Sequence, residues 1–380
     1  MDAHHQGSLN ANSRRLFYPP ATREDLLLAC PVAPRRVDGA SSRLRTLVWR
    51  AADCGRNLSP KDIELEAFRP LVGEDKQVRV VSWNRNFPGR KTAKRQGDLL
   101  RELSSDLMHL QEVNPGSSEV LRAAAGADWM VRAIDLRTPK PDDPPVLWHG
   151  VAVAGRGPRP CRCWLLDGIP QSERILLIET QTRGTPFIAT SYHAPPGVML
   201  GIVKPRQAVA FARWLSTQNV PLLFGADSNT PFIDALDFAY TRTHWHTGDR
   251  HLQGERGDDI LFDPWKMHDL DDALRRWVKL HPHKSQASKP SAEAAIPNWK
   301  SLSPAMRLKR EREVPLAITH RVGKKKNSPD TGRRFDSVWV SRHWVVRHIE
   351  HLYEKGIAAG SDHAPVIVDL DLTARPRREE

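Results

Sequence analysis

The residues best suited to chemistry in this chain occur in six short motifs, each directly after a strand-like run. They are Asn84 and Asn86 in SWNRN, Glu112 in LQE, His193 in SYHAPP, Asp227 and Asn229 in GADSN, Asp336 in RRFDSV, and Asp362 with His363 in GSDHAP. Carboxylate and amide oxygens bind hard divalent cations, and imidazoles transfer protons near neutral pH. Phosphodiester hydrolysis needs charge neutralisation at the phosphoryl oxygens and an activated water, and these residue types can supply both.

Each motif has a structural alternative when it is considered alone. An Asp or Asn after a strand commonly forms a turn or caps a helix, and an isolated His commonly has a structural role. Layered α/β folds, however, assemble their sites at strand ends. The recurrence of such residues after six strand-like runs therefore favours one shared site.

The segments that carry the motifs alternate between short apolar runs, typical of strands, and amphipathic stretches, typical of helices. Strands are predicted at residues 78–84, 107–112, 129–134, 149–155, 174–181, 186–192, 221–225 and 365–372, and helices at 91–105 and 204–217. Regular alternation of apolar residues in the last run predicts a half-buried strand. The order of the elements indicates an α/β class.

Taken in order, the motifs resemble the signatures of the endonuclease/exonuclease/phosphatase superfamily, the deoxyribonuclease I-like fold. WNxN, QE, a central His, GxDxN, an Asp-bearing strand and a terminal SDH all occur, and HGVAVAG matches a further strand of the family. The resemblance implies a four-layer α/β (α+β) sandwich, in which two packed mixed β-sheets are flanked by helices. We therefore expect a catalytic domain at residues 77–375, with an N-terminal extension of unknown role at 1–76 and a basic insertion at about 240–333.

The expected activity is metal-dependent hydrolysis of a phosphodiester by in-line attack of an activated water. The expected metal ligands, suited to Mg²⁺ or Mn²⁺ rather than zinc, are Glu112, Asn84, Asn86 and Asp362. His363 is expected to act as the base, with Asp336 as its partner by resemblance. The remaining expected catalytic residues are Asp227, which would orient the water, and Asn229 and His193, which would hydrogen-bond the phosphate.

The positive charge of the chain is concentrated in one segment. The whole chain carries a net charge of +12, and residues 274–334 alone contain sixteen Lys or Arg against four acidic residues. Such an excess attracts polyanions, nucleic acid first and anionic membranes second, although a basic loop can also be merely solvated. The expected nucleic-acid-binding residues are Arg307, Lys309, Arg310, Arg312, Arg321, Lys324, Lys325 and Lys326. Trp277 and Trp299 are expected either to stack on bases or, more commonly for Trp, to pack a small core.

A nuclease, and within that class an endonuclease, is the favoured interpretation. One alternative is a phosphatase or phospholipase C-like enzyme that acts on inositol phosphates, sphingomyelin or small nucleotides, because the same catalytic set serves all of these. The lack of an apolar hairpin in the sequence disfavours a lipid substrate. The other alternative is an inactive nucleic-acid-binding relative, which the complete residue set disfavours.

The bulk composition is that of a soluble globular protein, with 39% hydrophobic and 27% charged residues. No apolar run is long enough to span a bilayer, and the first twenty residues lack the apolar segment of a secretory signal, so a cytoplasmic location is expected. The four cysteines, Cys30, Cys54, Cys161 and Cys163, form no CxxC pair. Free thiols are therefore expected rather than a structural zinc site.

Overall fold

The computed structural model describes thirteen stretches of the chain. They are residues 78–137, 150–157, 159–182, 184–196, 203–230, 234–235, 241, 260–262, 266–283, 290–296, 298–311, 314–324 and 328–373. The predicted N-terminal extension, including the part of it that carries Cys30 and Cys54, lies outside the described residues. The following account concerns the described part of the chain.

The first sheet has six strands in the order β13-β14-β1-β2-β4-β3. Its strands are β1 (Val78–Asn84), β2 (Leu107–Val113), β3 (Trp129–Arg132), β4 (Gly150–Gly155), β13 (Trp344–His351) and β14 (Val366–Leu372). Strands β1 and β2 are parallel and the other pairs are antiparallel. The carboxyl ends of β1 and β2 therefore lie side by side, and these ends carry Asn84 and Glu112.

The second sheet also has six strands, in the order β5-β6-β7-β8-β12-β9. Its strands are β5 (Arg162–Trp164), β6 (Ile175–Thr182), β7 (Thr185–His193), β8 (Leu222–Asp227), β9 (Asp271–Asp272) and β12 (Asp336–Val340). Only β7 and β8 are parallel. Their carboxyl ends bear His193 and Asp227.

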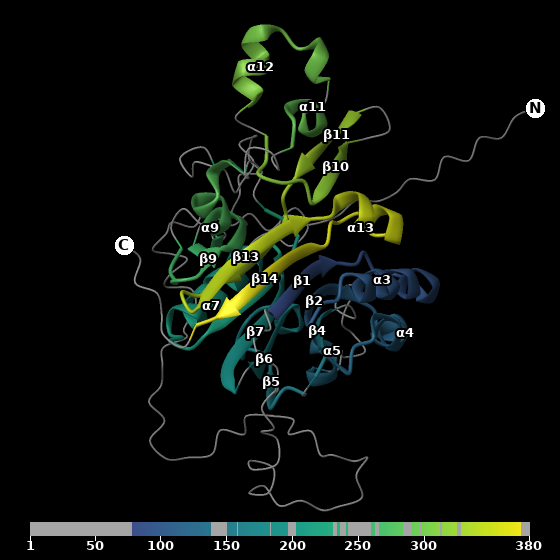
Figure 1. The fold of residues 1–380 in the computed structure, drawn as a ribbon, viewed down its shortest axis with the longest axis vertical. Helices are drawn as coiled ribbons and strands as arrows, with labels where there is room; N and C mark the ends of the chain where they lie inside the picture. The colour runs from purple at the N-terminus through teal and green to yellow at the C-terminus, as the bar shows by residue number, and fades with distance from the viewer. Residues whose placement is uncertain are drawn as a thin grey trace, which may run out of the picture.

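The two sheets pack face to face, with helices on both outer faces (Figure 1). Apolar side chains of both sheets, such as Val80, Val153, Ile178 and Val338, fill the space between them. Helices α3 (Arg90–Glu102) and α4 (Pro115–Ala125) cover the first sheet, and α7 (Val203–Ser216) covers the second. The short helical elements are α5 (Ala133–Leu136), η2 (Ser172–Arg174) and α13 (Tyr353–Ala359). This layering confirms the predicted four-layer α/β sandwich.

Two details of the predicted strands are wrong. The run at 129–134 is a strand only to Arg132, because Ala133–Leu136 turns into the short helix α5. Strand β14 was expected to be half-buried, but it is buried on both faces over most of its length. Ile367 packs under the helices of the first sheet, and Asp369 is covered because the Arg79 guanidinium donates to its carboxylate at 2.7 Å.

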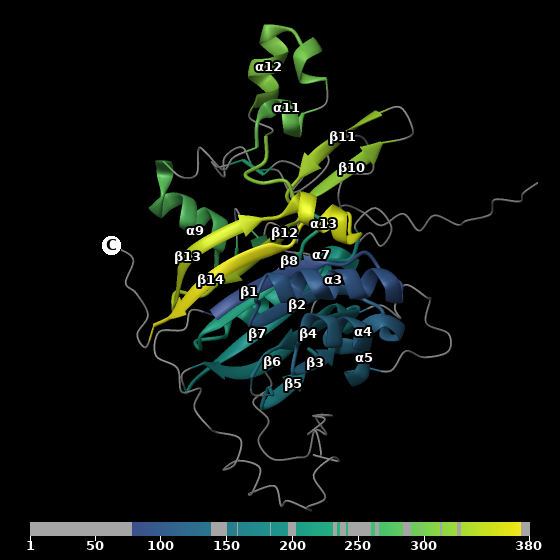
Figure 2. The same cartoon turned by 45° about the vertical axis from the view of Figure 1, so that its right-hand side comes forward.

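The segment expected to form an insertion has elements of two kinds. Strand β9 pairs with β12, and α9 (Ala273–Leu280) packs on β12 and β13, so both belong to the sandwich. The remaining elements form a unit that projects from one end of the molecule in both views (Figures 1 and 2). We call this unit the appendage; its elements are α11 (Ala292–Ala295), η5 (Trp299–Ser301), α12 (Pro304–Glu311), β10 (His320–Lys324) and β11 (Ser328–Arg333).

Both tryptophans proposed to stack on bases have packing roles. Trp277 is buried in the core between the sheets, with its ring stacked on His281. Trp299 packs against the small apolar cluster of the appendage, which is built from Ala295, Ile296 and Val314. Base stacking by Trp277 is therefore wrong, since its ring is not accessible.

An arginine cluster of four charged residues, of which three are buried and Arg275 is half-buried, ties the start of β12 to β9. Arg334 donates to Asp234 at 2.5 Å and to Asp272, and Arg275 donates to Asp234. Asp272 also accepts the backbone N–H of Leu274 at 2.9 Å, so it caps α9. With Arg276, which pairs with Asp271 at 3.1 Å, three of the sixteen basic residues counted in 274–334 are thus paired with acids that precede the segment.

Among the described helices, no span is long and apolar enough to cross a membrane. Cys161 and Cys163 are free thiols, as expected.

Candidate active site

Strand register places three candidate residues of the second sheet next to one another. Asp227, the last residue of β8, is paired with His193 on β7 and with Asp336 on β12. The three polar side chains therefore lie together because three neighbouring strands begin or end at this point. All three residues are buried.

The first sheet contributes Asn84 and Glu112. Glu112 has a φ of 53°, and the pairing of β2 with β4 shifts register between Leu110 and Val113. Such a bulge re-aims a side chain at the end of a strand, and a positive φ at a non-glycine residue costs of the order of 1 kcal/mol or more. This local strain accompanies the placement of the Glu112 carboxylate 3.7 Å from Nε2 of His193 on the other sheet.

Direct hydrogen bonds join the two sheets at the site. Nδ2 of Asn84 donates to Oδ2 of Asp227 at 2.7 Å, and the backbone N–H of Asn229 donates to Oδ1 of Asp227 at 2.9 Å. The side chain of Asn229 in turn donates to the carbonyl of Ala194 at 3.1 Å. Both oxygens of Asp227 are therefore fixed in direction.

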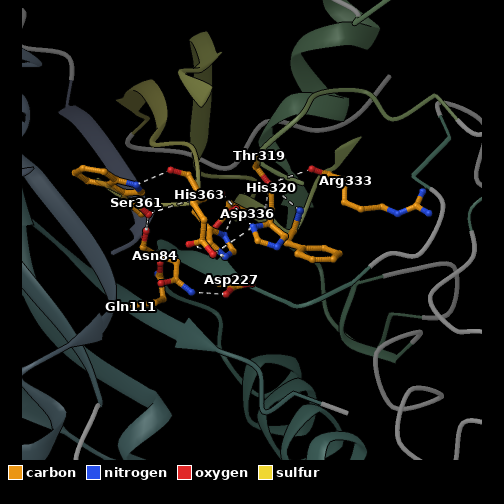
Figure 3. A network of polar contacts seen from close by, with 12 residues as sticks. Asn84, Gln111, Asp227, Thr319, His320, Arg333, Asp336, Ser361 and His363 are labelled. Atoms are coloured by element: carbon orange, nitrogen blue, oxygen red, sulfur yellow. Dashed lines mark hydrogen bonds and ion pairs between the residues drawn. The ribbon is translucent and has the colours of Figure 1, made fainter. Parts of the chain in front are cut away.

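His363 lies in the loop before β14 and is oriented by Asp336 (Figure 3). Its Nδ1 donates to Oδ2 of Asp336 at 2.8 Å. Trp83 donates to the carbonyl of His363 at 2.9 Å, and Ser361 donates to the carbonyl of Asn84 at 2.7 Å. These bonds attach the loop to the end of β1, so the ring is held at the junction of the two sheets.

We call Asn84, Glu112, His193, Asp227, Asp336 and His363 the strand-end cluster. Burial disfavours the imidazolium form of His363, but the charges of Asp336 and Asp227 outweigh it and raise the pKa of His363 to about 10. Burial also raises the pKa of Asp336 to about 6 against the opposing charge of His363. For Asp227, burial is outweighed mainly by the charge of His363, and its pKa is lowered.

The second histidine of the cluster has the opposite environment. Burial and the positive charge of Arg174 lower the pKa of His193 to about 3. The Arg174 guanidinium lies 2.9 Å from Nδ1 of His193, and Arg174 is itself buried. Two histidines of one cluster are thus driven to opposite charge states, the pattern typical of divided acid–base roles.

Glu112 indicates where a cation fits. Burial, together with the negative charges of Asp227 and Asp362, raises the pKa of Glu112 to about 7 although a hydrogen bond with Asn84 opposes the shift. A carboxylate in such surroundings is stabilised in its charged form by a bound cation. Two groups of side chains also have ligand atoms close enough to share one ion: Asp227, Asp336 and His363, and also His320, Asp362 and His363.

Two of the expected ligands lie outside this tight cluster. Asp362 is at its rim, with a half-exposed side chain and an oxygen 4.0 Å from Nε2 of His363. Asn86 is exposed; its backbone N–H donates to Oδ1 of Asn84 at 3.0 Å, and no contact of its side chain with the cluster occurs among the described residues.

Sequence reasoning missed Thr319, which precedes β10, and His320, which begins it. The His320 ring stacks on His363 with centroids 4.4 Å apart, and its Nδ1 donates to the carbonyl of Asp362 at 3.0 Å. The Thr319 hydroxyl accepts the N–H of Asp336 at 3.1 Å, and its carbonyl accepts the N–H of Ala364. Neither residue follows a recognisable motif, so only the hairpin geometry reveals them (Figure 3).

The expected nucleic-acid-binding residues are only partly described. Lys309 is exposed on α12, where Arg310 is half-buried, whereas Arg307 donates to the carbonyls of Trp299 and Lys300. Arg321 donates to the carbonyl of Ala294 and lies over the Tyr353 ring. Arg312, Lys325, Lys326 and the side chain of Lys324 lie outside the described residues.

Two mixed sheets packed face to face, with polar side chains gathered at their strand ends, form the α/β sandwich that the resemblance of the sequence motifs to the endonuclease/exonuclease/phosphatase superfamily implied. No family model matches the chain, and no curated protein matches it.

Several solved structures are similar to the chain. TDP2 of D. rerio in complex with a single-strand DNA product is 14% identical, with a TM-score of 0.48, over 78% of this chain and 100% of that chain. An endonuclease/exonuclease/phosphatase from Bacteroides vulgatus is 15% identical, with a TM-score of 0.45, over 78% and 100%. A protein of the same description from Beutenbergia cavernae is 18% identical, with a TM-score of 0.46, over 79% and 72%.

Proposed function

We propose that the chain is a divalent-metal-dependent phosphodiesterase that cleaves nucleic acid, in particular an endonuclease. The observation that carries this proposal is the strand-end cluster, where the His363–Asp336 pair lies beside the fixed carboxylate of Asp227 and the half-buried carboxylate of Glu112. In-line hydrolysis needs a group that exchanges a proton, an oriented water and donors to the phosphoryl oxygens at one place. The cluster contains side chains suited to each of these tasks.

In the proposed mechanism, His363 exchanges a proton at Nε2. Because Nδ1 donates to Asp336, the hydrogen on that nitrogen is fixed and Nε2 is the atom left for the reaction. Asp227 orients the attacking water, since Asn84 and the Asn229 backbone hold both of its oxygens in place. Asn229 and His193 donate hydrogen bonds to the phosphoryl oxygens as negative charge develops.

The residues present fit a hard divalent cation. Glu112 and Asn84 are the proposed inner ligands, which Asp362 at the rim and the exposed Asn86 would complete, because Glu112 is a half-buried carboxylate whose neighbours are themselves acidic. When bound, Mg²⁺ or Mn²⁺ supplies Lewis-acid polarisation of the phosphate and neutralises the acidic cluster.

Nucleic acid is the proposed substrate because the basic appendage begins at the site. His320, the first residue of β10, stacks on His363, so the appendage and the strand-end cluster are continuous. Lys309 on α12 is exposed, as cations that contact a phosphate backbone must be. This arrangement favours a long polyanion over a small phosphodiester.

A substrate panel tests the proposal. Plasmid DNA, RNA, phosphoinositide vesicles and bis(p-nitrophenyl) phosphate are incubated with the full chain and Mg²⁺ or Mn²⁺, with EDTA and His363→Ala as controls. We expect cleavage of a nucleic acid, its loss with EDTA, and nicking of closed circular plasmid. Cleavage of the vesicles alone would contradict the substrate class, and a folded chain that hydrolyses nothing would contradict the proposed activity.

A further inference from the structure

The polarity of one buried hydrogen bond determines how His193 can act. Nη1 of Arg174 lies 2.9 Å from Nδ1 of His193. A guanidinium has only donors and stays charged in proteins, so the nitrogen of His193 must be the acceptor. The contact is therefore the reverse of that at His363, where Nδ1 is the donor and a carboxylate is the acceptor.

The acceptor role of Nδ1 places the hydrogen of the His193 ring on the other nitrogen. Nε2 lies 3.4 Å from Oδ2 of Asp227 and 3.7 Å from Oε1 of Glu112. Both distances exceed those of a good N–H···O hydrogen bond. The Nε2–H group thus points between the two carboxylates and remains available to an oxygen that enters the site.

Arg174 is well placed to enforce this arrangement. It ends η2 directly before β6, is only 3% exposed, and faces a His193 that is 5% exposed. Its neighbour Glu173 accepts from Arg137 at 3.1 Å, so that acidic side chain is engaged with another cation. Water cannot readily replace a donor buried to this degree.

We propose that Arg174 is a positioning residue that fixes the Nε2–H tautomer of His193, so that His193 donates a hydrogen bond to a phosphoryl oxygen and does not take a proton. This inference rests on the proposed function, which it deepens by dividing the work of the two histidines. His363, paired with a carboxylate, handles the proton, while His193, paired with a guanidinium, is a fixed neutral donor.

The tautomer can be measured without any activity. The full chain is labelled with ¹⁵N-histidine, and long-range ¹H–¹⁵N correlation spectra are recorded near neutral pH without metal or substrate, with His193 assigned from the signals lost in His193→Gln. We expect an unprotonated Nδ1 and a protonated Nε2 for His193. A protonated Nδ1, or a ring protonated at both nitrogens, would overturn the inference even if the chain proves to be a nuclease.

Two substitutions at Arg174, one that reverses the charge and one that keeps it, give the matched variants. Arg174→Glu offers an acceptor and should move the hydrogen to Nδ1, whereas Arg174→Lys keeps a donor and should keep the tautomer. On the cleaved substrate, we expect kcat to fall on the order of 10²-fold for Arg174→Glu with little change in KM, and to be largely retained in Arg174→Lys. Circular dichroism confirms folding. If a folded Arg174→Glu keeps both the wild-type tautomer and its kcat, Arg174 does not position His193.

Discussion

The molecule has two clusters of charged residues that meet in the sequence at Phe335, because Arg334 belongs to the arginine cluster and Asp336 to the strand-end cluster. The two clusters differ in the balance of their charges. In the arginine cluster, Arg275 and Arg334 face Asp234 and Asp272, so cations and anions are equal in number. The strand-end cluster has three carboxylates, from Glu112, Asp227 and Asp336, and the cations that contact it are His363 and the neighbouring Arg174. Its other histidine, His193, has a pKa of about 3 and so adds no charge near neutral pH.

The difference shows what each cluster is for. A buried ion is costly unless it is paired, so a balanced cluster can serve structure alone. An unbalanced cluster is stabilised when positive charge enters from outside. An added cation would therefore stabilise the strand-end cluster, while the arginine cluster already contains its own cations.

The largest effect in this comparison is expected from His363→Ala in the strand-end cluster. Loss of the group that exchanges the proton should lower kcat by about 10³-fold or more, with the fold retained. Steady-state cleavage of the preferred nucleic acid measures the loss, and thermal unfolding checks the fold. The exposed His348, replaced by Ala, is the matched control. Near-normal turnover in a folded His363→Ala would remove His363 from the mechanism.

The corresponding substitution in the arginine cluster is Asp272→Asn, which is expected to lower stability. It leaves the buried Arg334 without one of its two partners and weakens the cap of α9, so the free energy of unfolding should fall by about 3 kcal/mol. Urea unfolding measures this change. Asp371→Asn, at a pair with the half-exposed Arg347, should cost less than about 1 kcal/mol. Equal losses in the two variants would show that burial does not distinguish the pairs.

A smaller, pH-dependent effect is expected beside the arginine cluster. Burial, followed by the charge of Arg334, lowers the pKa of His351 from its usual 6.5 to about 3. Above pH 6.5 His351 is neutral in both the folded and the unfolded chain, so it does not lower the free energy of unfolding. As the pH falls toward 3, the unfolded chain takes up a proton that the folded chain refuses, so stability is lost.

This loss can be isolated with one substitution. At pH 5 the His351 contribution should amount to about 2 kcal/mol relative to pH 7, and His351→Gln should remove it. Urea unfolding at the two pH values measures the difference between variant and wild type, with the exposed His348→Gln as control. An unchanged pH dependence in His351→Gln would show that His351 is not the residue responsible.

The smallest expected effect lies outside both clusters. Replacing Lys309 and Arg310 by Gln should weaken nucleic-acid binding a few-fold near 0.1 M salt, reduce the salt dependence by about two charges, and leave kcat unchanged. Fluorescence anisotropy across a salt series measures this. Lys94→Gln, which removes a cation paired with Asp98 on α3, is the control. A salt dependence unchanged in the double variant would remove α12 from the binding surface.

Much of the fold could be predicted from the sequence because most strands of the sandwich have a local signal, although β5, β9 and β13 were not predicted. Short apolar runs end at polar residues, and in parallel neighbours such as β7 and β8 these ends must meet. The burial of β14 on both faces could not be predicted, because the cover over Ile367 comes from helices distant in sequence.

The site was harder to predict where it depends on contacts between distant elements. Asp227 ends a strand as predicted, whereas His363 and Asp336 do not follow strands: His363 lies between α13 and β14, and Asp336 begins β12. Arg174 and His320 have no such signal: one lies at the end of a short η2 turn and the other begins a hairpin. The charge count likewise could not show that Arg275 and Arg334 are neutralised by acids earlier in the chain.

The contacts of Thr319 with Asp336 and Ala364 limit how this protein can be shortened. Thr319 and His320 belong to the appendage by position, yet they hold Asp336, Ala364 and His363 in place. A truncation designed to remove the appendage must therefore keep the paired residues His320 and Arg333. The chain must be rejoined on the far side of this pair from the sandwich. A cut at the visible edge of the sandwich would remove these contacts with the strand-end cluster along with the appendage.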